Sequence, residues 1–356
     1  MLLRSAIPVV LMLANAGVAA QEMHSEEPAM PSFVPFGEVR LRYEETRDIP
    51  GRVDDIHRGR GRARIGMRYH GLEAWEFGGA FELALGSDDN ADNRRNKDNE
   101  RSDHANIDQL YARYRFSEAS ELLLGKAELP LQLSPLLWDE DHRPIGASVN
   151  VQVASGDFNA WSLAAGYFAP DHLYDDHSRL AAVQLGYHFQ QGAPNGASAL
   201  LSYLAFSDLD RLVQQGLGRT NRRTPRQFIS NYRLLDLQLS ARTEVGGWPF
   251  VGRIDLVRNT AADDLNHGGR ASLVLGDAHD GGFEFGFAYQ RAERDAVLSA
   301  FADDDWWFQS FARGGMPWVG YGFNEHLRIR MAGFHERRDA FSRYTDRYLV
   351  DLTAQW

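Results

Sequence analysis

Apolar and polar residues alternate along the last stretch of the chain, residues 346–356. Tyr348, Val350, Leu352, Ala354 and Trp356 occupy every second position, and polar or charged residues lie between most of them. This period of two predicts a strand with one apolar and one polar face. A terminal aromatic residue on such a strand is typical of an outer-membrane barrel, where it anchors the chain at the lipid interface. The alternative is an ordinary half-buried strand of a soluble sandwich.

The same alternation recurs from residue 36 onward. Residues 283–290 show it most clearly, with Phe283, Phe285, Phe287 and Tyr289 on one face. The total is about sixteen strands, an even number, as in bacterial single-chain barrels. The predicted strands are 36–44, 60–69, 75–85, 106–116, 121–127, 146–154, 159–168, 180–189, 196–206, 231–242, 250–258, 268–276, 282–290, 307–321, 326–335 and 346–356.

The connections between these segments alternate between short and long. The short turns are 71–74, 117–120, 155–158, 190–195, 245–249, 277–281 and 322–325. The long, polar connections are 46–59, 87–105, 128–145, 169–179, 207–230, 259–267, 291–305 and 337–345. Short periplasmic turns and longer extracellular loops distinguish transmembrane barrels from soluble sandwiches. We therefore expect an all-β fold, a transmembrane antiparallel β-barrel over residues 36–356.

The N-terminal residues 1–20 read as a secretory signal. Arg4 supplies the positive charge, residues 7–13 the apolar core, and Val18-Ala19-Ala20 a small-residue cleavage site. Residues 21–35 are polar and contain three prolines, which indicates a periplasmic lead-in without fixed structure. These features predict export to the outer membrane of a Gram-negative cell, with the C-terminal strand recognised by the barrel-assembly machinery.

Composition excludes several classes of protein. The mean hydropathy is −0.42 and 24% of residues are charged, so beyond residue 20 no apolar run approaches the about 20 residues that a membrane helix needs. The absence of cysteine excludes disulfides, thiolate zinc sites and cysteine nucleophiles. A formal net charge of −11 argues against a nucleic-acid partner.

Arginine dominates the polar faces of the first and last predicted strands. Among 38 basic residues the lysines are Lys97 and Lys126, and the planar guanidinium binds carboxylate or phosphate oxygens two at a time. A barrel of this width leaves an aqueous lumen, so we expect a basic wall along it. For any single arginine, pairing with a neighbour such as Glu38, Glu44 or Asp351 is the alternative. The candidate pore-lining residues are Arg40, Arg42, Arg62, Arg64, Arg68, Arg113, Arg115, Arg328, Arg330 and Arg347.

The connection 128–145 differs from the other long loops, which we read as almost wholly polar. It is apolar first and acidic afterwards. An apolar loop is better folded into the lumen than left in water. It would then form a constriction loop in which Asp139, Glu140 and Asp141, followed by Arg143, face the arginine wall. A subunit contact or a lipid-facing plug is the alternative use of residues 129–138.

The signal, the alternating strands and the aromatic last strand together resemble the sixteen-stranded Gram-negative porins. Leu122-Leu123-Leu124-Gly125-Lys126-Ala127-Glu128-Leu129-Pro130, followed by Ser134-Pro135-Leu136-Leu137-Trp138-Asp139, is similar to the segment that enters the third loop in putative porins of the phosphate-selective O/P type. The arginine-rich residues 60–70 also resemble theirs. The resemblance implies arginines along the pore and a homotrimer. The chain lacks the lysine cluster of those phosphate channels, so phosphate selectivity is not carried over.

Two functions follow from this reading. The first is a porin, through which small hydrophilic and anionic solutes diffuse passively. The alternative is a barrel dedicated to export or uptake of an acidic polysaccharide or sugar acid, since an arginine-lined lumen also suits a polyanion. No Gly-x-Ser-x-Gly or His-Glu-x-x-His motif occurs, and we expect no enzymatic activity, cofactor or metal. The expected partners are outer-membrane lipid, lipopolysaccharide and small anionic solutes.

Overall fold

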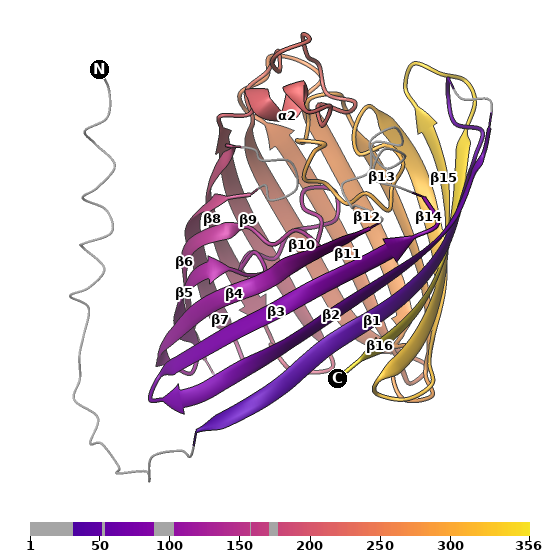
Figure 1. Cartoon of the computed structure of the whole chain (residues 1–356). Helices are drawn as coiled ribbons and strands as arrows, with labels where there is room; N and C mark the ends of the chain where they lie inside the picture. Colours follow the sequence, from indigo (N-terminus) through magenta and orange to yellow (C-terminus); the bar gives the residue numbers. More distant parts are fainter. Residues whose placement is uncertain (1–30, 52–53, 89–102, 157, 171–176) are drawn as a thin grey trace, which may run out of the picture.

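The computed structural model describes residues 31–51, 54–88, 103–156, 158–170 and 177–356. In these residues sixteen antiparallel strands form one closed barrel, each paired with its neighbours in sequence and β1 paired with β16 (Figure 1). The expected signal, residues 1–20, lies outside the described residues. The strands are β1 (Ser32–Arg47), β2 (Ile56–Leu72), β3 (Trp75–Gly86), β4 (His104–Ser117), β5 (Ser120–Lys126), β6 (Ile145–Ala154), β7 (Ala160–Ala169), β8 (Arg179–Phe189), β9 (Gly196–Ser207), β10 (Arg233–Val245), β11 (Trp248–Asn259), β12 (His267–Gly276), β13 (Phe283–Ala292), β14 (Ala312–Gly322), β15 (Leu327–Arg338) and β16 (Thr345–Gln355).

The last residue of the chain takes part in closing the barrel. Beyond β16, the backbone N–H of Trp356 donates to the carbonyl of Gly37 at 3.0 Å, and the Gly37 N–H donates to the Trp356 carbonyl at 3.0 Å. A Cβ at position 37 would meet the indole ring of Trp356, so glycine lets the two strands approach. Closure leaves no free sheet edge.

The period-two pattern decides which face of each strand points outward. On β13, Phe283, Phe285, Phe287 and Tyr289 are each 45–48% exposed, whereas Ala288 between them is 0% exposed. The other strands repeat this alternation, and their outward rows form a continuous apolar surface. Such a large exposed apolar surface is not expected in water and suits contact with acyl chains. The all-β barrel predicted from the sequence is confirmed.

Several strand boundaries differ from the prediction, and β2, for example, runs over Ile56–Leu72 instead of residues 60–69. β1 begins at Ser32 rather than at residue 36. β14 begins at Ala312 rather than at residue 307, because Glu336 on β15 accepts hydrogen bonds from the backbone N–H groups of Trp307 (2.9 Å) and Phe308 (3.0 Å). These bonds hold the chain before Ala312 in a connection instead of a strand.

Three connections at the long-loop end pack with inward-facing strand residues in one buried cluster. They are residues 127–144, residues 293–311 and residues 208–232, and the last contains the short helix α2 (Asp210–Gln214). Leu136 (1% exposed) and Phe301 (2%) belong to one cluster with Leu180 on β8 and Leu204 on β9. The described residues include no helix that is long and apolar enough to cross a membrane.

Candidate functional site

Four arginines project from β1 and β2 toward the inside of the barrel. Arg40 and Arg42 alternate with outward Leu41, and Arg62 and Arg64 flank outward Ala63. The strand register places Arg40 directly opposite Arg62. Like charges in such a position repel each other, so the cluster needs carboxylates from elsewhere.

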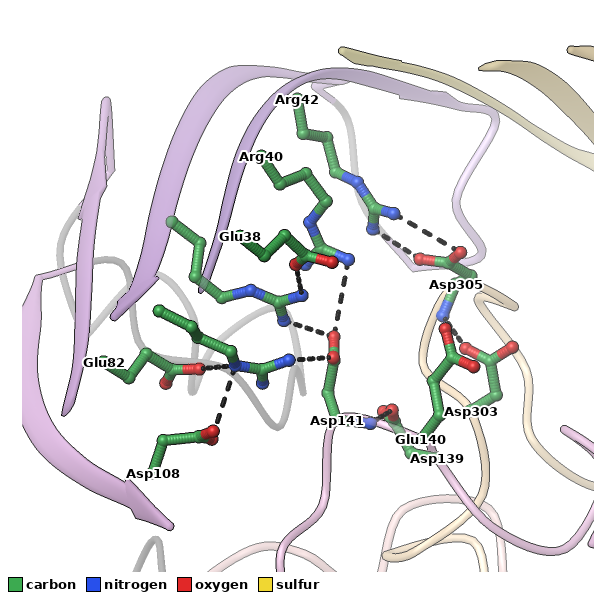
Figure 2. A network of polar contacts seen from close by, with 12 residues as sticks. Glu38, Arg40, Arg42, Glu82, Asp108, Asp139, Glu140, Asp141, Asp303 and Asp305 are labelled. Carbon is green, nitrogen blue, oxygen red and sulfur yellow. Dashed lines mark hydrogen bonds and ion pairs between the residues drawn. The ribbon is translucent and has the colours of Figure 1, made fainter. Parts of the chain in front are cut away.

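One of those carboxylates comes from the connection 127–144. Asp141 accepts a hydrogen bond from Arg64 Nη1 at 2.9 Å, pairs with Arg62, and lies 3.4 Å from Arg40 Nη1 (Figure 2). Strand carboxylates contact the same guanidinium groups. Glu38 accepts from Arg62 at 2.9 Å, and Glu82 accepts from Arg64 at 2.6 Å. Charge-assisted bonds of this kind are the stronger hydrogen bonds of proteins, so Asp141 tethers its loop to the wall.

The other end of this loop contacts the opposite side of the ring. The backbone N–H of Gln132 donates to Gln184 on β8 at 3.0 Å, and the Gln132 carbonyl accepts from Gln238 on β10 at 3.0 Å. Asp141 meanwhile contacts β1 and β2, which lie across the sixteen-strand ring from β10. Residues 127–144 therefore cross the lumen.

A second connection, residues 293–311, enters the barrel beside the first. Asp305 pairs with Arg42, which also donates to Asp351 on β16 at 2.6 and 2.9 Å. Arg347 on β16 donates to the carbonyls of Asp304 (2.6 Å) and Asp305 (3.0 Å) and to Glu44 on β1 (2.7 Å). The same arginine wall thus holds both inserted segments.

The two inserted segments also contact each other. The Asp139 N–H donates to the Phe301 carbonyl at 2.8 Å, and the Asp303 N–H donates to the Pro135 carbonyl at 3.0 Å. The rings of Trp138 and Phe301 stack with centroids 5.6 Å apart. This contact fixes the position of each segment relative to the other.

A cluster of three carboxylates lies at the junction of the segments. Asp139, Asp303 and Asp304 each place an oxygen atom within 4.8 Å of the others. Carboxylates at this spacing could act as ligands of a hard divalent cation. Either a cation or protonation would relieve their mutual repulsion.

The carboxylates that pair with arginines, Asp141 and Asp305, differ in the direction of their pKa shifts from the clustered carboxylates Asp139 and Asp303. Burial raises the pKa of Asp139 well above its ordinary value, and the charges of Asp304 and Asp141 raise it further. Burial also raises the pKa of Asp303 well above its ordinary value, with contributions from Asp305, Asp304 and Glu140. Burial acts in the same direction on the other pair, but Arg62, Arg64 and Arg40 hold the pKa of Asp141 well below its ordinary value. The pKa of Asp305 is likewise lowered, by the charges of Arg42, Arg347 and other arginines.

These shifts predict that the two segments pack more tightly as the pH falls from neutral toward about 4. Asp139 and Asp303 have raised pKa values in the folded protein, so ionising them costs docking free energy, and acidification removes that cost. The stabilisation from Asp141 and Asp305 is present above the ordinary carboxyl pKa and is lost only as the pH falls toward their lowered values.

We therefore expect single-channel current noise from segment motion to be lower at about pH 5 than at about pH 7. The double variant Asp139→Asn, Asp303→Asn should show low noise at both values. A wild-type pH difference that persists in the double variant would contradict this assignment.

The remaining candidate residues separate into smaller groups. Arg113 and Arg115 on β4 contact Glu76 at 2.9 and 3.0 Å, nearer the short-turn end. Arg68 lies over the ring of Phe36 at 4.4 Å. Arg330 on β15 lies 5.5 Å from the Trp318 ring, and Arg328 is exposed beside it. The arginines therefore form three clusters along the inner wall.

The acidic residues of the first inserted segment also take different positions. Asp141 reaches the arginines, whereas the carboxylate of Asp139 lies with Asp303 and Asp304. The Glu140 side chain is exposed. Arg143 lies 3.2 Å from Glu128 and 3.8 Å from Asp108 on β4.

Sequence reasoning missed the second inserted segment. The expectation that the other long loops are almost wholly polar is wrong for residues 296–302, Ala-Val-Leu-Ser-Ala-Phe-Ala, which are buried. Asp303, Asp304 and Asp305 follow directly. The signal was available, because an apolar run before an acidic triplet also characterises residues 129–141.

Comparisons with known proteins agree with the barrel architecture. No model of a known protein family matches the sequence, and no curated protein matches it. Solved structures do match the fold. OprB of Pseudomonas putida at high pH matches with a TM-score of 0.59 at 12% identity, over 91% of this chain and 93% of that one. OmpF of Salmonella typhi, in complex with daunomycin, matches with a TM-score of 0.57 at 12% identity, over 91% of this chain and 97% of that one. The trimer form of in-vitro folded OmpT, an outer-membrane protein of Vibrio cholerae, matches with a TM-score of 0.54 at 12% identity, over 92% of this chain and 100% of that one.

These matches cover almost the whole length of each chain at low identity. The closed ring is therefore a known architecture. The chain has the fold of the sixteen-stranded outer-membrane porins.

Proposed function

We propose that the protein is a non-enzymatic channel of the Gram-negative outer membrane, through which small hydrophilic solutes diffuse passively. One observation carries the proposal. Asp141 and Gln132, on one inserted segment, contact opposite walls of a barrel whose outer surface is apolar. A segment that crosses a polar lumen narrows a water-filled path without replacing it, because sixteen strands enclose more space than their side chains fill.

The narrowing favours small solutes over a polymer. Residues 293–311 enter beside residues 127–144, and the two segments contact each other between the arginine wall and the β8–β10 wall. An acidic polysaccharide would have to displace both segments. Passive diffusion of small solutes therefore fits the geometry better than the alternative of a dedicated polymer channel.

We assign the anion preference of the channel mainly to the arginines of β15. The arginines that contact Asp141 make a smaller contribution. Arg328 and Arg330 point into the lumen, and in the described part of the chain no carboxylate lies within ion-pair distance of either. Asp351 is opposite Arg330 in the register, but its carboxylate is bonded to Arg42. An anion in the lumen would therefore meet these two guanidinium groups directly.

The double variant Arg328→Gln, Arg330→Gln should reduce the permeability ratio of chloride to potassium. The reversal potential of single channels in a salt gradient across a planar bilayer measures it. Arg47→Gln is the matched control, because Arg47 faces outward on β1 and pairs with Glu45. An unchanged reversal potential in the double variant would exclude β15 as the origin of selectivity, and absence of any channel activity would contradict the proposed function itself.

Two further features belong to the same proposal. Assembly as a homotrimer is supported by the trimer form of the Vibrio protein, and the mass of the detergent-solubilised protein would test it. Residues 122–139 are similar to the phosphate-selective O/P type. Phosphate and chloride are therefore the first two solutes to compete in these recordings.

A further inference from the structure

Three arginines lie side by side on the outer wall of the barrel. Arg291 on β13 is directly opposite Arg313 on β14, and Arg313 is directly opposite Arg337 on β15. All three point away from the lumen. Arg291 continues the exposed row of Tyr289, and the other two alternate with the buried Met316 and Glu336. They lie at the long-loop end, since β13 ends at Ala292, where residues 293–311 begin.

This arginine row has too few carboxylates to balance it. Like charges directly opposite each other on neighbouring strands repel. Asp339 lies 3.7 Å from Arg313, and Arg337 lies over the Tyr344 ring at 5.3 Å. Within the described ranges no carboxylate lies within ion-pair distance of Arg291. The strand register therefore brings three guanidinium groups together, and among the described residues one carboxylate, Asp339, is in ion-pair contact with the row.

The neighbouring acidic groups are already engaged. Glu293 lies 3.8 Å from His267 and accepts a hydrogen bond from its backbone N–H at 3.0 Å. Asp346 contacts His335 at 2.6 Å. The charge balance of the row therefore calls for an anion from outside the chain.

An open groove adjoins the row at Arg291. Gly269 on β12 lies opposite Arg291 in the register, and its missing side chain leaves a groove of about 360 Å³ between the side chains of β11 and β13. The part nearer the membrane centre is apolar, and the part nearer the long loops contains Arg291 together with His267 and Glu293, which contact each other. The apolar lining residues are Ile254, Leu256, Ala271 and Tyr289.

We propose that the arginine row and this groove bind a phosphorylated lipid of the outer leaflet. The phosphate is held by Arg291, Arg313 and Arg337, and an acyl chain lies in the groove over Gly269. A guanidinium fork matches phosphate oxygens two at a time, and the apolar floor matches a hydrocarbon chain. An amphipathic groove on the lipid-facing wall favours a lipid over a free anion. The inference rests on the proposed outer-membrane location, because only there does this wall meet a phosphorylated glycolipid.

Lipid binding to the full-length protein, purified in a neutral detergent, tests the proposal. Bisphosphorylated lipid A is titrated and bound complexes are counted by native mass spectrometry, with the same lipid lacking both phosphates as the comparison. The triple variant, which combines Arg291→Gln, Arg313→Gln and Arg337→Gln, should bind lipid A about tenfold more weakly or worse. Gly269→Leu, which fills the groove and leaves the arginines, should also weaken it.

Arg179→Gln is the matched control and should bind as the wild type does. Arg179 faces outward at the long-loop end of β8, and its register partner is Ser207. Heat-modifiable migration in gels confirms that each variant is folded.

Equal affinity for the phosphorylated and dephosphorylated lipids would overturn the proposal. So would a wild-type affinity in the triple variant, or inorganic phosphate binding as tightly as lipid A. Normal conductance without lipid affinity would refute the lipid site and leave the channel intact. A protein that conducts no ions and stays soluble without detergent would instead refute the proposed function.

Discussion

Asp141→Asn is expected to shift the channel strongly toward anions and to loosen the first inserted segment. One carboxylate contacts Arg40, Arg62 and Arg64, and its loss leaves these guanidinium groups with less compensating charge. Removing one partner of a fully buried ion pair costs about 3–5 kcal/mol. The Asp141 side chain is 19% exposed, so we expect the lower end of that range. The reversal potential in a potassium chloride gradient should move toward the chloride equilibrium potential, and the open-channel current should rise.

Glu140→Gln provides the matched control for this variant. It removes one negative charge at the adjacent residue, and the Glu140 side chain is exposed. A change of similar size in both variants would show that net charge alone, and not the tether at Asp141, sets the selectivity.

Phe301→Ala should separate the two inserted segments while leaving the barrel closed. Phe301 stacks on Trp138 at 5.6 Å and on Phe206 of β9 at 5.8 Å, and it is 2% exposed. Truncating a buried phenylalanine costs about 3–5 kcal/mol. That cost falls on the contact between the segments and the wall, because the strand hydrogen bonds are untouched. We expect larger and noisier single-channel currents, with the heat-modifiable barrel retained.

Two controls limit the interpretation of Phe301→Ala. Phe301→Leu keeps most of the apolar volume and should change the current less. Phe323→Ala removes an aromatic ring that is 50% exposed at the short-turn end, and should not change it. If the noise of Phe301→Ala equals that of the wild type, the contact between residues 127–144 and 293–311 does not control the open path.

Asp141→Asn and Phe301→Ala separate electrostatic from apolar anchoring of the inserted segments. Asp141 connects residues 127–144 to β1 and β2, whereas Phe301 connects residues 293–311 to Trp138 and to β9. The ion pairs of Asp141 and the ring contacts of Phe301 involve different side chains. If both anchors hold the same constriction, the double variant should conduct more than either single variant.

The local alternation of the chain was enough to predict the barrel. Each strand shows its two faces within a few residues, as Phe283, Phe285 and Phe287 do on β13. Loop lengths then indicated which end carries the short turns. Prediction was poorest where polar contacts override the local pattern, as at Trp307 and Phe308, which Glu336 holds in a connection.

The sequence named Glu38, Glu44 and Asp351 as carboxylates beside the arginines, but it did not show which arginine each of them contacts. Arg42 and Asp351 lie 309 positions apart, and the contact of Arg42 with Asp305 depends on where residues 293–311 run. The row of Arg291, Arg313 and Arg337 follows from the strand register alone, and nothing in the spacing of these residues reveals it.

The sequence by itself therefore determined the strands, their outward faces and the closed ring, because a period of two is a local property that each segment carries independently. Only the tertiary structure decided which carboxylate meets which arginine and that two connections, not one, enter the lumen. Those contacts join residues far apart in the chain, and their energies depend on burial and distance, which no single segment specifies.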